Sequence, residues 1–160
     1  MSVLVDSTVW ISYFRGTKGE EEVSKALDYL LSGDEATVNE VIRTEVMPMM
    51  TVRGEDASLL EAVRCPDLLI DWSSVRSLQV KCLRNGLNKV GIGDLVIALD
   101  AVSRDEPLFS LDRHFRLMKK VLPALKLWPQ LLLLREPVWR RYGAASALDA
   151  WWQVLLYSHW

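Results

Sequence analysis

The sequence is poor in the features that mark several classes of protein. It has two cysteines in 160 residues, Cys65 and Cys82, and their spacing matches no zinc motif. Its formal net charge of -2 gives no general attraction to nucleic acid, so such binding would depend on a local basic patch. No apolar run approaches the roughly 20 residues of a membrane span. We therefore expect a soluble, cytoplasmic protein with buried, reduced thiols, no signal peptide and no membrane association.

Internal repeats and low-complexity segments are also absent. The chain is 50% hydrophobic and 25% charged, which is ordinary for a soluble globular protein and excludes general disorder. At 160 residues it is long enough to bury a sizeable core in one domain.

The first ten residues organise the rest of the chain. Residues 3–5 are continuously apolar and largely β-branched, as in a strand buried on both faces of a parallel sheet. Asp6 follows, and Ser7 is expected to cap a helix that continues through Val9 and Trp10. An acid at the carboxyl end of a central parallel strand lies where α/β sheets usually place their chemistry.

Strand and helix patterns alternate along the chain to residue 128. Further strands are expected at 36–38, 68–70, 108–110 and 125–127, and helices at 20–31, 39–51, 55–63, 75–83, 95–103 and 113–120. Pro48 is expected to kink the helix that contains it. The pattern predicts a three-layer α/β/α domain with a mostly parallel sheet of four or five strands.

Residues 129–160 differ in character from the preceding domain, 1–128. This extension holds four of the seven tryptophans, and apolar positions from 144 to 155 follow helical spacing. A C-terminal helical appendage with a wide apolar face is expected. Its own domain or a second subunit or partner would have to cover that face, since large exposed apolar patches are rare on monomers. Its role is open.

Glu45 is the anomalous acid of the 39–51 helix. Its helical neighbours Val41, Ile42 and Met49 are apolar, which places it on the inward face. Glu40 instead neighbours Arg43 and is expected to face solvent.

Two further acids begin helices after apolar segments. Asp94 shares a helix face with Ile97 and Ala98, and Asp112 follows the strand at 108–110. Each could be only a helix cap, since Asp caps helices well. Asp71 has a capping context without a second acid nearby, and Asp100 is expected to form a surface pair with Arg104.

A parallel sheet could bring Asp6, Glu45, Asp94 and Asp112 to one crevice. Two like charges about 4 Å apart repel by roughly 4 kcal/mol at an effective dielectric of 20. A divalent cation would remove the conflict, and an all-oxygen site suits Mg²⁺ or Mn²⁺ better than zinc. His114 and His159 are too far apart in sequence to suggest a ligand pair. Hydrolysis of a phosphodiester is the natural chemistry of such a site.

At these residues the chain resembles PIN-domain ribonucleases, and more narrowly the VapC toxins of toxin–antitoxin pairs. The resemblance covers about residues 1–128 and is carried, in the family's order, by residues 3–11, 43–46, 93–98 and 109–115. It implies that Asp6, Glu45, Asp94 and Asp112 bind metal, and that Thr8, Ser7 and Ser110 hold metal-bound waters or position the phosphate. It also implies an Mg²⁺-dependent endoribonuclease acting on structured RNA, a homodimer, and inhibition by a small VapB-type antitoxin.

Basic residues lie beside the acid-bearing segments. They could contact phosphates of an RNA substrate, or form solvated helix faces. The candidates are Arg43, Arg113, Arg116, Lys119 and Lys120.

Other classes of function remain alternatives. A haloacid-dehalogenase-like phosphohydrolase or phosphotransferase also begins with an acid after its first strand, but a second Asp is expected where this chain has Thr8. A response-regulator-like module would need paired acids at the first strand. A catalytically inactive PIN-like module that only binds partners would not need acids at all four places.

Overall fold

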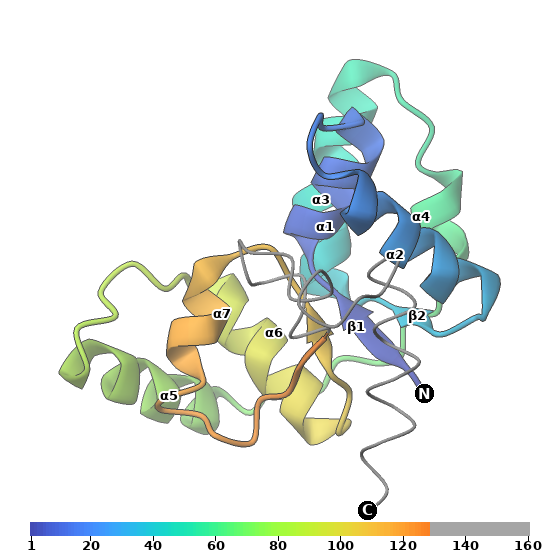
Figure 1. Ribbon diagram of the computed structural model, residues 1–160. Helices are drawn as coiled ribbons and strands as arrows, with labels where there is room; N and C mark the ends of the chain where they lie inside the picture. The colour runs from blue at the N-terminus through green and yellow to red at the C-terminus, as the bar shows by residue number, and fades with distance from the viewer. Residues whose placement is uncertain (129–160) are drawn as a thin grey trace, which may run out of the picture. The chain divides into compact units, whose positions relative to one another are not determined.

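A four-stranded parallel sheet forms the centre of the protein. The computed structural model describes residues 1–128 (Figure 1). The strands are β1 (Val3–Val5), β2 (Ala36–Thr37), β3 (Leu108–Phe109) and β4 (Leu127–Trp128), in the order β2-β1-β3-β4. Every strand pair is parallel, which confirms the expected sheet.

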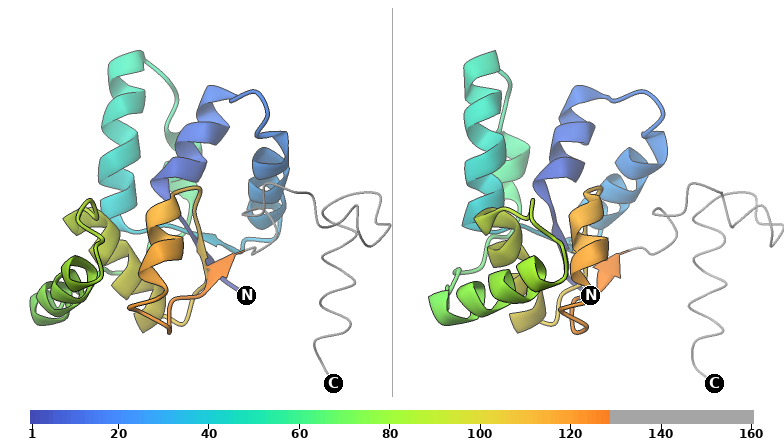
Figure 2. Two further views of the ribbon diagram at one scale, coloured as in Figure 1. Left: turned by 60° about the vertical axis from the view of Figure 1, so that its left-hand side comes forward. Right: turned by 90° about the vertical axis from the view of Figure 1, so that its left-hand side faces the viewer.

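Helices flank this sheet. Figures 1 and 2 show α1 to α4 gathered in one group and α5 to α7 in another, with the strands between the groups. The expected three-layer fold is therefore confirmed for the described residues, whereas the expected helix at 144–157 lies outside them. The helices are α1 (Ser7–Arg15), α2 (Glu21–Ser32), α3 (Glu40–Arg53), α4 (Ser58–Ala62), α5 (Trp72–Arg84), α6 (Ile92–Ser103) and α7 (Arg113–Met118).

In α/β sheets a crevice for ligands generally forms where the strand order reverses, and in this sheet that place is beside β1. The chain leaves β1 for β2 on one side, then crosses back to β3 on the other, so the direction of winding reverses between β1 and β3. Val5 is paired with Phe109 at the carboxyl ends of these two strands. The residues that follow, Asp6 and Ser110, must therefore emerge side by side at the place where α/β sheets bind ligands.

The core explains why the sheet can carry polar groups at this edge. All of β1 is fully buried, and the Trp10 side chain is buried beneath the start of α1. Its indole N–H donates to the Val5 carbonyl at 3.1 Å, which satisfies a polar group at the end of the strand. Phe109 and Phe115 are buried on the β3 side. The strand ends are thus anchored rigidly on both sides of the crevice.

The strand expected at 68–70 is absent. Leu69 is 91% exposed, while Leu68 and Ile70 are partly buried and line a cavity of about 240 Å³ against α5 and α6. The alternating burial is strand-like, but the edge beside β2 is already met by Arg64, whose carbonyl accepts from the Val38 N–H at 3.0 Å. Segment 68–70 therefore has the pattern of a strand, but it stays unpaired because Arg64 already occupies the sheet edge at β2.

Asp100 and Arg104 form the expected pair, but the expected surface location is wrong. Their atoms Oδ2 and Nη2 lie 2.8 Å apart, and Asp100 is only 6% exposed. The same carboxylate oxygen accepts from the Asn39 side-chain amide at 2.8 Å. Because Asn39 caps α3, this network joins the start of α3 to the middle of α6.

Three smaller expectations have mixed outcomes. Both cysteines are free, with Cys82 buried as expected and Cys65 partly exposed, its thiol 3.3 Å from Glu40. Helix α3 continues through Pro48 to Arg53. Asp71 caps α5, as its sequence context indicates.

Among residues 1–128, no helix is long and apolar enough to cross a bilayer.

Candidate active site

Asp6 lies at the carboxyl end of β1 and is only 2% exposed. It is itself the N-cap of α1, the position expected for Ser7, because its carboxylate accepts from the Thr8 N–H at 3.3 Å. The Thr8 hydroxyl donates to the same oxygen, Oδ2, at 2.5 Å, and the Ser110 hydroxyl at 2.7 Å. Three donors on one oxygen fix the rotation of the carboxylate.

Burial raises the pKa of Asp6. The hydrogen bonds from Thr8 and Ser110 oppose this effect because they stabilise the ionised form, and the negative charge of Glu45 raises the pKa further. Hydroxyl groups therefore hold the buried carboxylate in place, and no basic side chain among residues 1–128 forms an ion pair with it.

Thr8 and Ser110 connect the two strand ends. Their hydroxyl oxygens lie 3.4 Å apart. The Leu111 N–H donates to the Thr8 hydroxyl at 3.1 Å, and the Asp112 N–H donates to the Ser110 hydroxyl at 3.0 Å. The loop after β3 is thereby fixed against the start of α1. Ser7, the first residue of α1, is buried in the same region.

Asp94 is the third residue of α6 and is partly buried. Its Oδ2 accepts from the Gly91 N–H at 2.9 Å, so Asp94 helps to stabilise the start of α6, but Gly91 and not Asp94 is the N-cap. Burial raises the pKa of Asp94. The Gly91 N–H opposes that effect, the charge of Asp112 raises the pKa further, and His114 lowers it.

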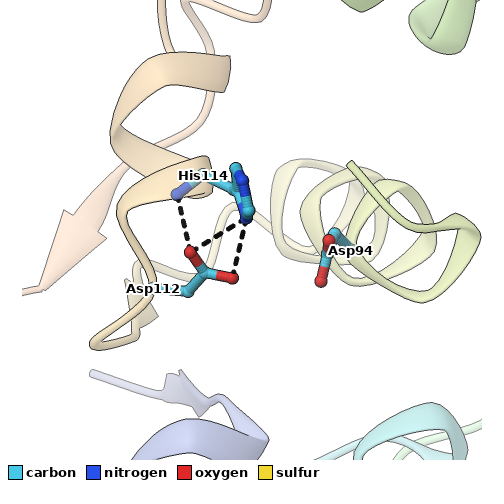
Figure 3. A group of neighbouring side chains, drawn as sticks. All are labelled: Asp94, Asp112 and His114. Atoms are coloured by element: carbon cyan, nitrogen blue, oxygen red, sulfur yellow. Dashed lines mark hydrogen bonds and ion pairs between the residues drawn. The ribbon is translucent and has the colours of Figure 1, made fainter. Parts of the chain in front are cut away.

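Asp112 caps α7 and brings a histidine to the site. Its carboxylate accepts from the His114 N–H at 2.8 Å, and the His114 ring Nδ1 lies 3.1 Å from it. Asp94, Asp112 and His114 each offer a ligand atom within 4.8 Å of the others (Figure 3). His114 is not among the site residues expected from the sequence. A local signal for it does exist, because a residue two positions after a helix cap can fold back against the capping side chain.

Glu45 lies at the rim of the site and not in the core. Its side chain is exposed, although Ile42 on the same helix face is fully buried. A Cβ built on Gly93 would stand 2.9 Å from Glu45 Oε1, so the carboxylate lies against the first turn of α6. Its charge also acts on Asp6. Glu45 therefore borders both Asp6 and the segment that carries Asp94.

Contacts and charge effects together link the four acids in a ring. The negative charge of Glu45 acts on Asp6, and Glu45 lies against Gly93 beside Asp94. The negative charge of Asp112 acts on Asp94, and Ser110 joins Asp112 back to Asp6 by hydrogen bonds. The structure thus places the four expected acids around one crevice. Among the described residues, the ligand atoms of Asp94, Asp112 and His114 lie within 4.8 Å of one another, and Asp6 and Glu45 lie outside that group. Carboxylate oxygens and hydroxyls are ligands that suit a hard divalent cation. Burial raises the pKa of Asp6 and Asp94 because it disfavours their ionised forms, which such a cation would stabilise.

The basic candidates divide into two groups. Arg43 donates to the carbonyls of Glu61 and Val63, both at 3.0 Å, and pairs with Glu40. These contacts hold the segment after α4, so the structure does not support the expected phosphate contact for Arg43. The others lie on α7 or directly after it, next to Asp112; Arg113, Arg116 and Lys120 are exposed, and Lys119 is partly buried.

Comparison with known proteins agrees with this architecture. A search of curated proteins found no match. A chain in the crystal structure of VapBC2 from Rickettsia felis bound to a DNA fragment from their promoter has a similar fold, with a TM-score of 0.60. The two chains are 15% identical, and the match covers 79% of this chain and 97% of that one. The PIN domain family model matches residues 3–121, which include the whole ring of acids. The chain therefore belongs to the PIN domain family.

Proposed function

We propose that this protein is an Mg²⁺-dependent endoribonuclease, with Mn²⁺ as a possible substitute, and that it is the toxin of a type II toxin–antitoxin pair. The observation that carries the proposal is the ring of Asp6, Glu45, Asp94 and Asp112 at the crevice between β1 and β3. Membership of the PIN domain family supports it, since metal-dependent nuclease activity is general in that family.

The four acids would hold the cation. When bound, a divalent cation supplies a water of lowered pKa and stabilises the charge that develops on a phosphodiester. The protein's part is positioning. The hydroxyls of Thr8 and Ser110 orient Asp6, and the Gly91 N–H orients Asp94. These restraints hold the acids in place before substrate arrives, which lowers the cost of assembling the site.

Helix α7 would bind the RNA backbone. It begins directly after Asp112 and carries Arg113 and Arg116 one turn apart, and Lys119 and Lys120 follow its last residue, Met118. Phosphate contacts from this helix would place the scissile bond next to the acids. With a net charge of only -2, the whole chain does not repel RNA strongly enough to cancel such a local patch.

The partners are proposed from the structural similarity. The related structure is a VapBC2 complex, and a small VapB-type antitoxin with a homodimeric toxin is the corresponding assembly here. A small open reading frame beside the gene, with a product that copurifies with this chain and inhibits it, would support the toxin assignment over a housekeeping nuclease.

The alternatives are less well supported. In a haloacid-dehalogenase-like enzyme a second Asp would occupy position 8, but here the Thr8 hydroxyl donates to Asp6. An inactive partner-binding module would have no need of four acids at one site. Burial, with a smaller effect of neighbouring negative charge, raises the pKa of Asp6 and Asp94, which is a cost when no cation is bound.

The test is RNA cleavage by the purified full chain. Cleavage should require Mg²⁺ or Mn²⁺ and stop on chelation. Asp6→Asn and Asp94→Asn should each abolish it, whereas the matched control Asp71→Asn, at a helix cap outside the ring, should retain it. Unchanged cleavage by both site variants would overturn the proposal.

A further inference from the structure

His114 is the one imidazole within the described residues, and it lies at the candidate active site. It stands on the first turn of α7, and its side chain is 23% exposed. Its ring Nδ1 is 3.1 Å from the Asp112 carboxylate, and its backbone N–H donates to the same group at 2.8 Å. Figure 3 shows the ring beside Asp112, with Asp94 approaching from α6. Two contacts with one carboxylate fix the orientation of the ring.

The contact with Asp112 orients the ring so that one of its nitrogens can serve as a ligand. A neutral imidazole carries a proton on one nitrogen and keeps a free lone pair on the other, and that lone pair can bind a cation. Neighbouring carboxylates commonly orient histidine ligands in metalloproteins.

Asp94 supplies a second carboxylate close to this ring. Asp94, Asp112 and His114 each offer a ligand atom within 4.8 Å of the others, although they come from two helices that are distant in sequence. His114 also lowers the pKa of Asp94, as expected of a group close enough to stabilise its charge. The three side chains are therefore near enough to share one cation.

We propose that His114 is a nitrogen ligand of the active-site cation and that it makes the site prefer Mn²⁺ to Mg²⁺. The inference rests on the proposed function and deepens it. Carboxylate oxygens bind both ions, but imidazole suits transition metals, whereas Mg²⁺ prefers oxygen ligands. A mixed oxygen and nitrogen site therefore discriminates between ions that an all-oxygen site would treat alike.

The test is pulsed electron paramagnetic resonance of the full chain loaded with Mn²⁺. A directly bound imidazole nitrogen should give ¹⁴N coupling to the Mn²⁺ spin. The chain has two histidines, so His159→Gln is a matched control that should keep the coupling. His114→Asn should lose it, because an asparagine amide can replace the Nδ1 hydrogen bond to Asp112 but offers no nitrogen with a lone pair.

Affinity measurements separate a ligand from a residue that only positions Asp112. In His114→Asn the dissociation constant for Mn²⁺ should rise about 10- to 100-fold, which is typical when a residue that supports a metal site is replaced. The dissociation constant for Mg²⁺ should change much less. Equal effects on both ions would overturn the inference.

The outcomes also distinguish this inference from the proposed function. Mn²⁺ binding that is lost in Asp94→Asn, but shows no nitrogen coupling in the unmodified chain, would overturn the role of His114 and leave the nuclease proposal standing. Nitrogen coupling that persists in His114→Asn would likewise overturn the role of His114 and leave the nuclease proposal standing. Failure of the unmodified chain to bind either Mn²⁺ or Mg²⁺ would overturn both.

Discussion

The hydroxyl of Ser110 donates a 2.7 Å hydrogen bond to Oδ2 of Asp6, across 104 residues of sequence. The pairing of Val5 with Phe109 makes this contact possible, because it brings the residues after β1 and β3 to the same level. Ser110 also accepts from the Asp112 N–H at 3.0 Å. One small side chain thus links two of the proposed metal-binding acids.

Replacing Ser110 with alanine should therefore affect both stability and cleavage. Asp6 would lose a donor while buried, and the Asp112 N–H would lose its acceptor, which together should lower the free energy of unfolding by roughly 1–3 kcal/mol. Urea denaturation of the metal-free protein measures this change. Ser110→Thr keeps the hydroxyl and serves as the control. Equal stability of the alanine variant and the unmodified protein would contradict the assigned hydrogen bonds.

The stability of the metal-free protein should depend on pH in an unusual direction. Burial raises the pKa of Asp6 and Asp94 in the folded state above the unfolded value of about 4. As the pH falls, Asp6 and Asp94 are protonated in the folded state at a higher pH than in the unfolded state. Their contribution to the free energy of unfolding therefore increases from neutrality down to about pH 4. Thermal denaturation across this range should show the gain, and Asp6→Asn should reduce it. A contribution from Asp6 that fell with falling pH would contradict the raised pKa.

The contact between Gly93 and Glu45 gives a test of the rim of the site. In Gly93→Ala the new Cβ would stand 2.9 Å from Glu45 Oε1, so the carboxylate must move. Because Oε1 is the end of a flexible, exposed side chain, the change in unfolding free energy should be small, roughly 1 kcal/mol. Cation affinity, measured by calorimetry, should nevertheless fall. An unchanged affinity would argue that Glu45 is not part of the cation site, and Glu45→Gln checks the same point directly.

The sequence was most informative where local pattern and topology agree. The apolar run at 3–5 and the acid after it could be placed because a parallel strand buried on both faces has a distinctive composition. The positions of Asp94 and Asp112 followed from their place at helix starts. The location of Glu45 was only half predictable, since helix spacing identifies its face but not whether the side chain ends in the core or at a rim.

The remaining features depend on contacts that are distant in sequence. The segment 68–70 has the pattern of a strand, but pairing needs a free sheet edge, and Arg64 occupies the edge beside β2. Asp100 looks like the exposed partner of Arg104 until Asn39, 61 residues away, is found to donate to it. His114 lies two residues after the cap Asp112, but its place beside a second acid depends on α6, which brings Asp94 near it. None of these neighbours is visible in a window of local sequence.

The Asp100 network should matter for folding and not for chemistry. Asp100 is 6% exposed and accepts from both Asn39 and Arg104 at 2.8 Å, so Asp100→Ala would leave two donors without their acceptor. Loss of one partner of a buried pair costs about 3–5 kcal/mol, with the lower end expected here because Arg104 keeps some solvent contact. Glu22→Ala removes an exposed ion pair with Lys25 and should change stability by less than about 1 kcal/mol. Urea denaturation compares the two variants. Asp100 is not in the ring of acids. At a temperature where the Asp100→Ala variant remains folded, its cleavage of RNA should therefore match that of the unmodified protein. A specific loss of cleavage under these conditions would show that the network also supports the active site.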